Sequence, residues 1–173
     1  MKLAYTMAPG RGDTDLLLAK LADDLCKRGV DCCGIVQTNS SQPGSHLCDM
    51  DVKVLPDGPI LRISQNLGKD SKGCRLNPSA LETAVGLVKA RLNGGTDLLI
   101  INKFGKHEAE GRGFRDVIGE ALEMDVPVLI GLNALNKPAF EDFAGDCATA
   151  VPPESDAIAA WIASVCSVDS KCR

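Results

Sequence analysis

Apolar runs that alternate with amphipathic helical patterns constrain the fold of this chain more than any other feature. Residues 2–7, 30–37, 98–101 and 126–132 are mostly apolar over the length of a strand, which is typical of strands buried on both faces of a sheet. Apolar residues at three-to-four spacing over 17–25 predict a helix after the first run. The alternation predicts an α/β fold, a doubly wound and mostly parallel sheet with right-handed crossovers.

The stretch from 38 to 77 interrupts this alternation. Turn-forming sequences at 39–44 and 56–59 separate two short extended pieces. They predict an inserted β-hairpin, with residues 47–55 against 60–65. Beyond it, further helices are expected near 78–92, 114–124, 138–143 and 154–165, and a brief strand near 147–151.

The length and composition fit one ordinary globular unit. With 173 residues the chain can bury one core, so we expect a single domain over 1–165 and a polar C-terminal tail over 166–173. No run approaches the roughly 18 to 20 apolar residues of a membrane-spanning helix, which predicts a cytoplasmic protein without membrane insertion. The net charge of -4 argues against nucleic acid as a partner.

Eight cysteines are many for a cytosolic chain, but no two of them form a C-x-x-C pair. No metal site is therefore predicted. Cys26, Cys32, Cys33 and Cys147 lie in apolar segments, where a thiol behaves as a small hydrophobe. Cys166 falls in the predicted tail, and the redox state of the cysteines is left open.

The turn after the first predicted strand has the length of a phosphate-binding loop. Such a loop follows G-x-x-x-x-G-K-[ST]: backbone N–H groups hold the phosphates, the lysine reaches the outer ones, and the hydroxyl ligates magnesium. Residues 7–14 keep Gly12 and Thr14 but have Met7 for the first glycine and Asp13 for the lysine. Two like charges about 4 Å apart repel by roughly 4 kcal/mol at an effective dielectric near 20. Triphosphate binding in the usual pose is therefore disfavoured.

Gly10 and Arg11 complete this turn, and Arg11 could restore a cation to it. An alternative interpretation needs no ligand. In it, Asp13 or Thr14 caps the following helix, and Asp15 favours the positive end of that helix.

The second candidate loop follows the strand predicted at 98–101. An active nucleoside-triphosphatase needs a carboxylate there to hold magnesium, and an acid beside it to orient water. This chain has Asn102 and Lys103, so hydrolysis by the ordinary route is disfavoured. The loop is instead basic, with Lys106 and, between two glycines, Arg112 before a helix N-terminus. A solvated loop with internal salt bridges is the alternative.

With these loops in view, the chain resembles a bacterial family of uncharacterised proteins in the P-loop superfamily, related to small nucleoside-triphosphatases and often linked with molybdenum uptake or cofactor genes. The resemblance covers nearly the whole chain and rests on residues 10–14, 73–76 and 102–113. In the related active enzymes the last block begins with two acids and reaches a glutamate at the place matching Glu108. Only Gly105 and Glu108 carry over, which makes the phosphate-binding motif degenerate and transfers the fold better than the activity.

Three functions are compatible with these residues. The first is a binding or regulatory protein for a small anionic ligand, either an oxyanion (phosphate or molybdate-like) or a nucleotide in an altered pose. The second is an unconventional nucleoside-triphosphatase with Glu108 as base. The third is an adaptor without a small-molecule ligand; a homodimer or a protein partner is left open. The residues predicted to line the ligand cleft are Gly10, Arg11, Gly12, Asp13, Thr14, Ser71, Gly73, Cys74, Arg75, Asn102, Lys103, Lys106 and Arg112.

Overall fold

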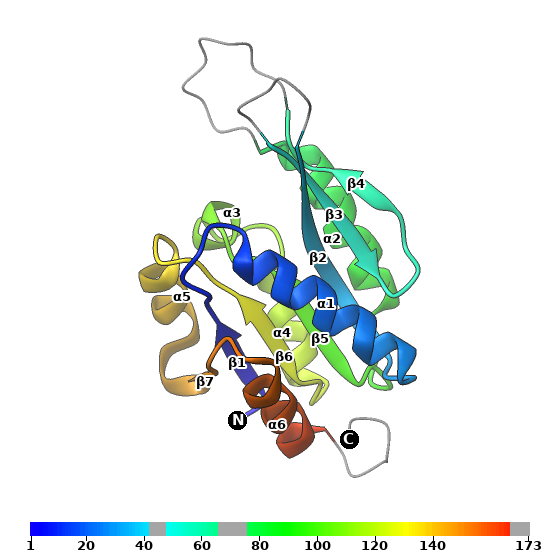
Figure 1. The fold of residues 1–173 in the computed structure, drawn as a ribbon, viewed down its shortest axis with the longest axis vertical. Coiled ribbons are helices and arrows are strands. Elements are labelled where there is room, and N and C mark those ends of the chain that lie inside the picture. Colours follow the sequence, from blue (N-terminus) through cyan, green and yellow to red (C-terminus); the bar gives the residue numbers. More distant parts are fainter. Residues whose placement is uncertain (42–47, 66–75, 167–173) are drawn as a thin grey trace.

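A computed structural model describes residues 1–41, 48–65 and 76–166 of the chain. These residues form a seven-stranded sheet in the order β4-β3-β2-β5-β6-β1-β7 (Figure 1). The strands are β1 (Leu3–Thr6), β2 (Cys32–Ser41), β3 (Cys48–Leu55), β4 (Ile60–Arg62), β5 (Leu98–Asn102), β6 (Val128–Gly131) and β7 (Ala148–Ala150). The helices are α1 (Asp13–Lys27), α2 (Pro78–Arg91), α3 (Lys106–Ala109), α4 (Arg115–Glu123), α5 (Lys137–Ala144) and α6 (Ser155–Val165), with a 3-10 turn η1 at Gly145–Cys147.

The sheet confirms the predicted doubly wound arrangement. β1 pairs in parallel with β6 and β7, and β5 pairs in parallel with β2 and β6. Among the described strands, the antiparallel pairs are those of β3, which lies between β2 and β4. β6 therefore separates β1 from β5, and the carboxyl ends of these three strands meet at one edge.

β2 is longer than predicted. It begins at Cys32 and continues to Ser41, although residues 38–41 are polar. The reason is backbone pairing, because β3 pairs with β2 along the whole stretch from Gly34↔Leu55 to Ser41↔Cys48. At Gly34 the backbone has φ 118°, and a Cβ there would lie 1.9 Å from the carbonyl oxygen of Ile100. Glycine therefore permits the close approach of β2 to β5.

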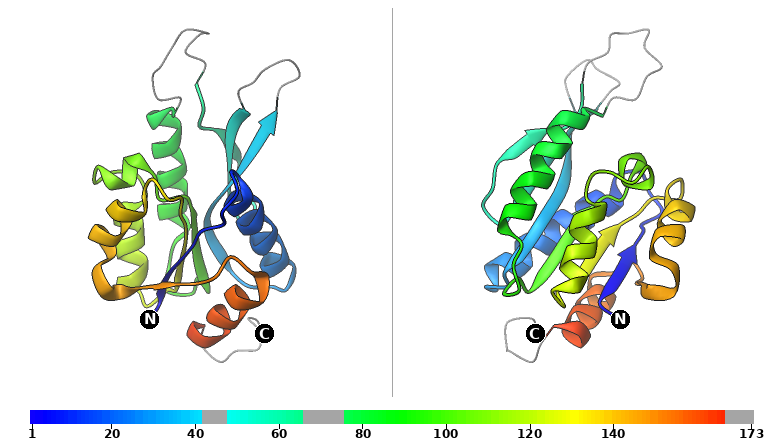
Figure 2. Two further views of the ribbon diagram at one scale, coloured as in Figure 1. Left: turned by 60° about the vertical axis from the view of Figure 1, so that its left-hand side comes forward. Right: turned by 180° about the vertical axis from the view of Figure 1, so that it is seen from behind.

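Helices cover both faces of the sheet (Figure 2). Apolar residues of α1 and α6 form one core with Leu98 and Ile100 of β5. Those of α2, α4 and α5 form the other with Leu99 and Ile101. The apolar run of β5 is thus buried on both sides, as its composition predicts.

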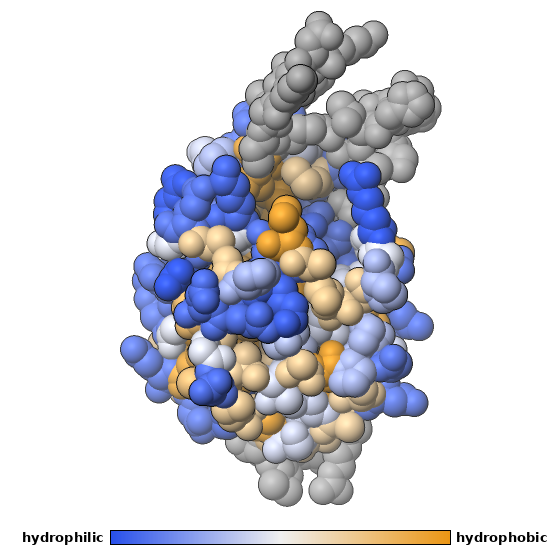
Figure 3. Space-filling model, turned by 90° about the vertical axis from the view of Figure 1, so that its left-hand side faces the viewer, coloured by the Kyte–Doolittle hydropathy of each residue, from blue (hydrophilic) through white to orange (hydrophobic). Residues whose placement is uncertain are grey.

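The surface is mixed in character. Figure 3 shows hydrophilic and apolar side chains interspersed over the face on the α5 side of the molecule. No helix among the described residues is long and apolar enough to cross a membrane. One cysteine expectation is wrong, because Cys147 is exposed rather than packed as a small hydrophobe. Cys166, which follows α6, is half-buried, and its thiol lies 3.5 Å from the backbone oxygen of Asp97.

Candidate functional site

The turn between β1 and α1 is closed by Thr14. Its hydroxyl oxygen accepts a hydrogen bond of 2.9 Å from the backbone N–H of Ala8, and Thr14 is buried. The N-cap of α1 is Gly12, with φ 85°, and no side chain caps the helix. The prediction that Asp13 or Thr14 caps α1 is therefore wrong, because the threonine hydroxyl faces back into the turn.

Asp13 is exposed and folds back over Gly10. A Cβ on Gly10 would lie 2.0 Å from Oδ2 of Asp13 and 2.6 Å from its Cγ. Any side chain at position 10 would displace the carboxylate. The space next to Gly10, where a conventional loop holds phosphate, is thus next to an acid.

Asn102 is the last residue of β5, and its side chain is fully buried. Neither amide atom, Nδ2 or Oδ1, has a hydrogen-bond partner among the described residues. A Cβ on Gly131, at the end of β6, would lie 2.7 Å from Asn102 Oδ1 and 3.3 Å from Cγ2 of Thr14. The missing side chain of Gly131 therefore leaves room for the asparagine beside the first turn of α1. The peptide that joins Asn102 to Lys103 is cis.

Lys103 links the two loops through an acid that the sequence interpretation did not place in the site. Its Nζ lies 4.0 Å from Oδ1 of Asp15, whose side chain is only 7% exposed. Gln37 of β2, also buried, donates to the other carboxylate oxygen of Asp15 at 3.4 Å. From the sequence, Asp15 is expected only to favour the positive end of α1. A glutamine that ends an otherwise apolar strand was the available signal for its buried partner.

Two other predicted basic residues pair with Glu110 rather than with this cluster. Lys106 is 3.6 Å from Glu110, and Arg112 pairs with the same carboxylate. All three side chains are at least 41% exposed. These contacts match the alternative of a solvated loop with internal salt bridges.

Glu108 holds the 105–114 loop together. Its two carboxylate oxygens accept backbone hydrogen bonds from Gly105 at 2.9 Å and from Phe114 at 3.2 Å. Burial raises the pKa of this carboxyl, and the backbone donors oppose that shift. His107, the next residue back along the loop, is buried, with Nε2 3.3 Å from Oε1 of Glu82.

The structure thus brings together, at the carboxyl edge of the sheet, the turn with Gly10, Gly12, Asp13 and Thr14 and the β5 end with Asn102 and Lys103. Arg11 is exposed in that turn. Among the described residues, no three His, Cys, Asp or Glu side chains are grouped as a metal would require. The predicted ligands Ser71, Gly73, Cys74 and Arg75 lie outside the described residues.

The chain is similar in sequence to a known protein. It is 35% identical over 160 residues to the Molybdenum import ATP-binding protein ModC 2 of Bradyrhizobium diazoefficiens. This match covers 92% of the chain but 18% of that protein, so the chain spans less than a fifth of the relative's length.

Two solved structures have the same fold. The solution structure of a human cancer-related nucleoside triphosphatase superposes with a TM-score of 0.62 at 19% identity, over 87% of each chain. The crystal structure of THEP1 from the hyperthermophile Aquifex aeolicus also gives 0.62, at 18% identity over 95% of this chain and 96% of that one. A family model described as "Protein of unknown function (DUF2478)" matches residues 3–161. On this evidence the chain belongs to the DUF2478 family and has the α/β fold of the P-loop nucleoside-triphosphatases.

Proposed function

We propose that this chain is a cytoplasmic binding or regulatory protein for a small oxyanion of the molybdate or phosphate kind. The ligand sits at the carboxyl edge of the sheet, between the first turn of α1 and the end of β5. The observation that carries the proposal is the Asn102 amide, buried with no partner for either of its polar atoms among the described residues.

A buried amide without hydrogen bonds costs about 1–3 kcal/mol, and such groups are rare in folded proteins. An oxyanion would accept a hydrogen bond from Nδ2 of Asn102. The hydroxyl proton of Thr14 is a second donor, because the oxygen of that group is already the acceptor for Ala8. N–H groups of the first turn of α1 add the positive end of a 15-residue helix.

The same residues are a poor fit for conventional hydrolysis. Asn102 brings no negative charge to a magnesium ion. Glu108, the base of the hydrolytic alternative, has both oxygens engaged with backbone donors. Without a cation at position 13, the outer phosphates of a nucleotide also lose their usual partner.

Molybdate is the first ligand to test. The relative that is 35% identical carries molybdenum import in its name, although the chain matches only 18% of it. A nucleotide held in an altered pose is the second candidate. The fold shared with nucleoside-triphosphatases supports that choice but does not extend to the catalytic groups.

Titration calorimetry with molybdate, tungstate, phosphate, ADP and ATP tests the proposal. We expect saturable binding of at least one oxyanion in the absence of magnesium, and loss of that binding in Asn102→Leu and Thr14→Val. The matched control is Thr83→Val, because Thr83 is an exposed α2 residue whose hydroxyl donates to the backbone oxygen of Ser79 in the same helix. Absence of heat from all five ligands at millimolar concentration would count decisively against this function.

A further inference from the structure

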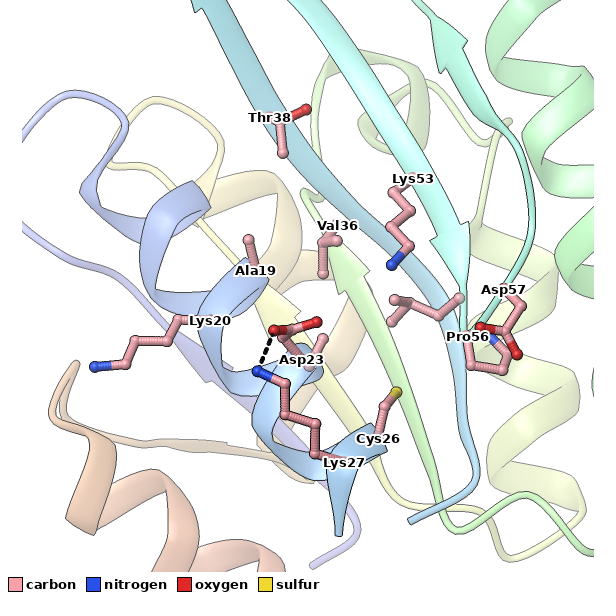
Figure 4. Close-up of a pocket in the computed structure, with 12 residues that line it drawn as sticks. Ala19, Lys20, Asp23, Cys26, Lys27, Val36, Thr38, Lys53, Pro56 and Asp57 are labelled. Carbon is pink, nitrogen blue, oxygen red and sulfur yellow. Dashed lines mark ion pairs between the residues drawn. The ribbon is translucent and has the colours of Figure 1, made fainter. Parts of the chain in front are cut away.

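A groove separates α1 from the β2–β3 part of the sheet (Figure 4). Its volume is about 450 Å³, within the range of small-molecule sites. The floor is apolar and consists of buried side chains, with Ala22 from α1, Val36 from β2 and Leu55 from β3. Cys26 lines it as well and is half-buried. The groove is thus distinct from the Asn102 cluster at the N-terminal end of α1.

One cation points into this groove. Figure 4 shows the side chain of Lys53 extending from β3 toward α1, while Lys20 points away from the groove. Lys53 is half-buried and has no ion pair within the part of the chain that the structure describes. Lys27, in contrast, is paired with Asp23 at 2.7 Å. Lys53 is therefore the rim cation left for a ligand.

The groove lining also contains two acids. Asp57, in the turn after β3, is exposed to solvent, and Asp23 of α1 is exposed and paired with Lys27. Burial raises the pKa of the Cys26 thiol. A hydrogen bond with Cys32 and the charge of Lys53 lower that pKa, and the charges of Asp57 and Asp23 raise it.

A second hollow of similar size lacks this feature. It lies between α2 and the 107–117 segment and has a volume of about 470 Å³. Its cations are already paired: Lys89 lies 2.5 Å from Glu120, and Arg112 contacts Glu110. An incoming anion there would have to break an existing pair. The α1–β3 groove offers an apolar floor and an unpaired ammonium together.

We propose that the α1–β3 groove binds a small monocarboxylate with an apolar body, whose carboxylate pairs with Lys53 while its tail covers Val36 and Leu55. A single ammonium matches a singly charged head group. Phosphate dianions are typically held by several donors or by an arginine fork, and no arginine lines the groove. This site is independent of the oxyanion function proposed for the sheet edge.

Octanoate is the probe, and Cys26 supplies a local readout. Affinity is measured by titration calorimetry. Occupancy is measured as protection of Cys26 from iodoacetamide, resolved by mass spectrometry of the peptide that contains it. We expect saturable binding with protection of Cys26. Lys53→Gln should weaken the affinity roughly tenfold, the scale of one charge-assisted hydrogen bond. Lys53→Arg should retain most of it.

Two controls separate this site from general adsorption. Lys20→Gln removes a lysine that points away from the groove and should bind octanoate like the wild type. Octanamide has the same length without the charge and should bind at least as weakly as octanoate binds Lys53→Gln. Equal affinity of octanoate for Lys53→Gln and the wild type, equal affinity of octanamide and octanoate, or binding without protection of Cys26 would each overturn the assignment.

Discussion

Replacing Asn102 by leucine should stabilise the ligand-free protein. Leucine has a similar size and shape, but it has no polar atoms to leave without partners. In the native chain both amide atoms of Asn102 are buried and lack a hydrogen-bond partner in the described residues. The substitution therefore removes an unfavourable term from the folded state, whereas most core substitutions add one.

The size of the gain can be worked out from the surroundings of the side chain. Release of an unsatisfied buried amide is worth about 1–3 kcal/mol. The leucine must fit against Thr14, Leu18 and the backbone of Gly131, and imperfect fit of a shape-conserving swap costs up to about 1.5 kcal/mol. The midpoints of these two ranges give an expected net gain of about 1 kcal/mol. For a chain of this length that corresponds to a rise in Tm of about 2–4 °C.

Gln37 provides the matched control, because it is also a buried amide near the same edge but has a partner. Its Nε2 donates to Asp15 at 3.4 Å, so Gln37→Leu leaves a buried carboxylate short of one donor and should destabilise by about 1–3 kcal/mol. Urea unfolding and thermal melts of both variants, without added ligand, show whether each substitution raises or lowers the free energy of unfolding. If Asn102→Leu lost as much stability as Gln37→Leu, the amide would be satisfied in the folded protein, and the argument for a ligand at this position would fail.

Three further outcomes follow from other contacts. Asp13→Lys should tighten ADP binding about 30-fold, because a change of two charges near 4 Å in a water-like dielectric is worth about 2 kcal/mol. The control is Asp24→Lys, one turn before the end of α1, which should leave the affinity for ADP unchanged. Equal effects of the two substitutions would show that only the net charge matters. Burial raises the pKa of Glu108 in the folded state, so the contribution of this carboxyl to stability is largest at acid pH and is lost as pH rises above about 4.5. Urea unfolding across pH 4.5–7 should show the free energy of unfolding of the wild type decreasing relative to that of Glu108→Gln. Parallel pH dependences of the two proteins would contradict this. Gly113→Ala should lower the stability by about 2 kcal/mol or more, because a Cβ there would lie 2.3 Å from Oε1 of Glu108. Gly111→Ala, where φ is 83° but the space is open, should lower it by only about 1 kcal/mol. Equal losses of stability in thermal melts would refute the predicted clash with Glu108.

The strands could be predicted from sequence where burial alone determines them. β5 and β6 are apolar on both faces, and no other element type fits runs so short and so apolar. The end of β2 could not be predicted in this way. Residues 38–41 are polar and resemble a turn, and they extend only because the inserted hairpin pairs with their backbone.

Part of the candidate site could likewise be predicted from the sequence, and part could not. Asp13 and Asn102 stand out in the sequence because they replace residue types that a known phosphate-binding motif requires. The contact of Lys103 with Asp15, and of Asp15 with Gln37, depends on how α1, β2 and the end of β5 meet. Spacing along the chain does not predict how these three elements pack, so the sequence alone does not place Asp15 in the site.

The charges at the sheet edge argue against a magnesium-bound triphosphate. A conventional site has its cation in the loop before α1 and its acid at the end of β5. Here Asp13 lies in that loop, and Lys103 follows the asparagine at the end of β5, with its ammonium 4.0 Å from Asp15. A triphosphate needs both a magnesium ligand and a cation near its outer phosphates, and this arrangement moves or removes each. A compact oxyanion needs only a few donors, which Asn102, Thr14 and the first turn of α1 can supply.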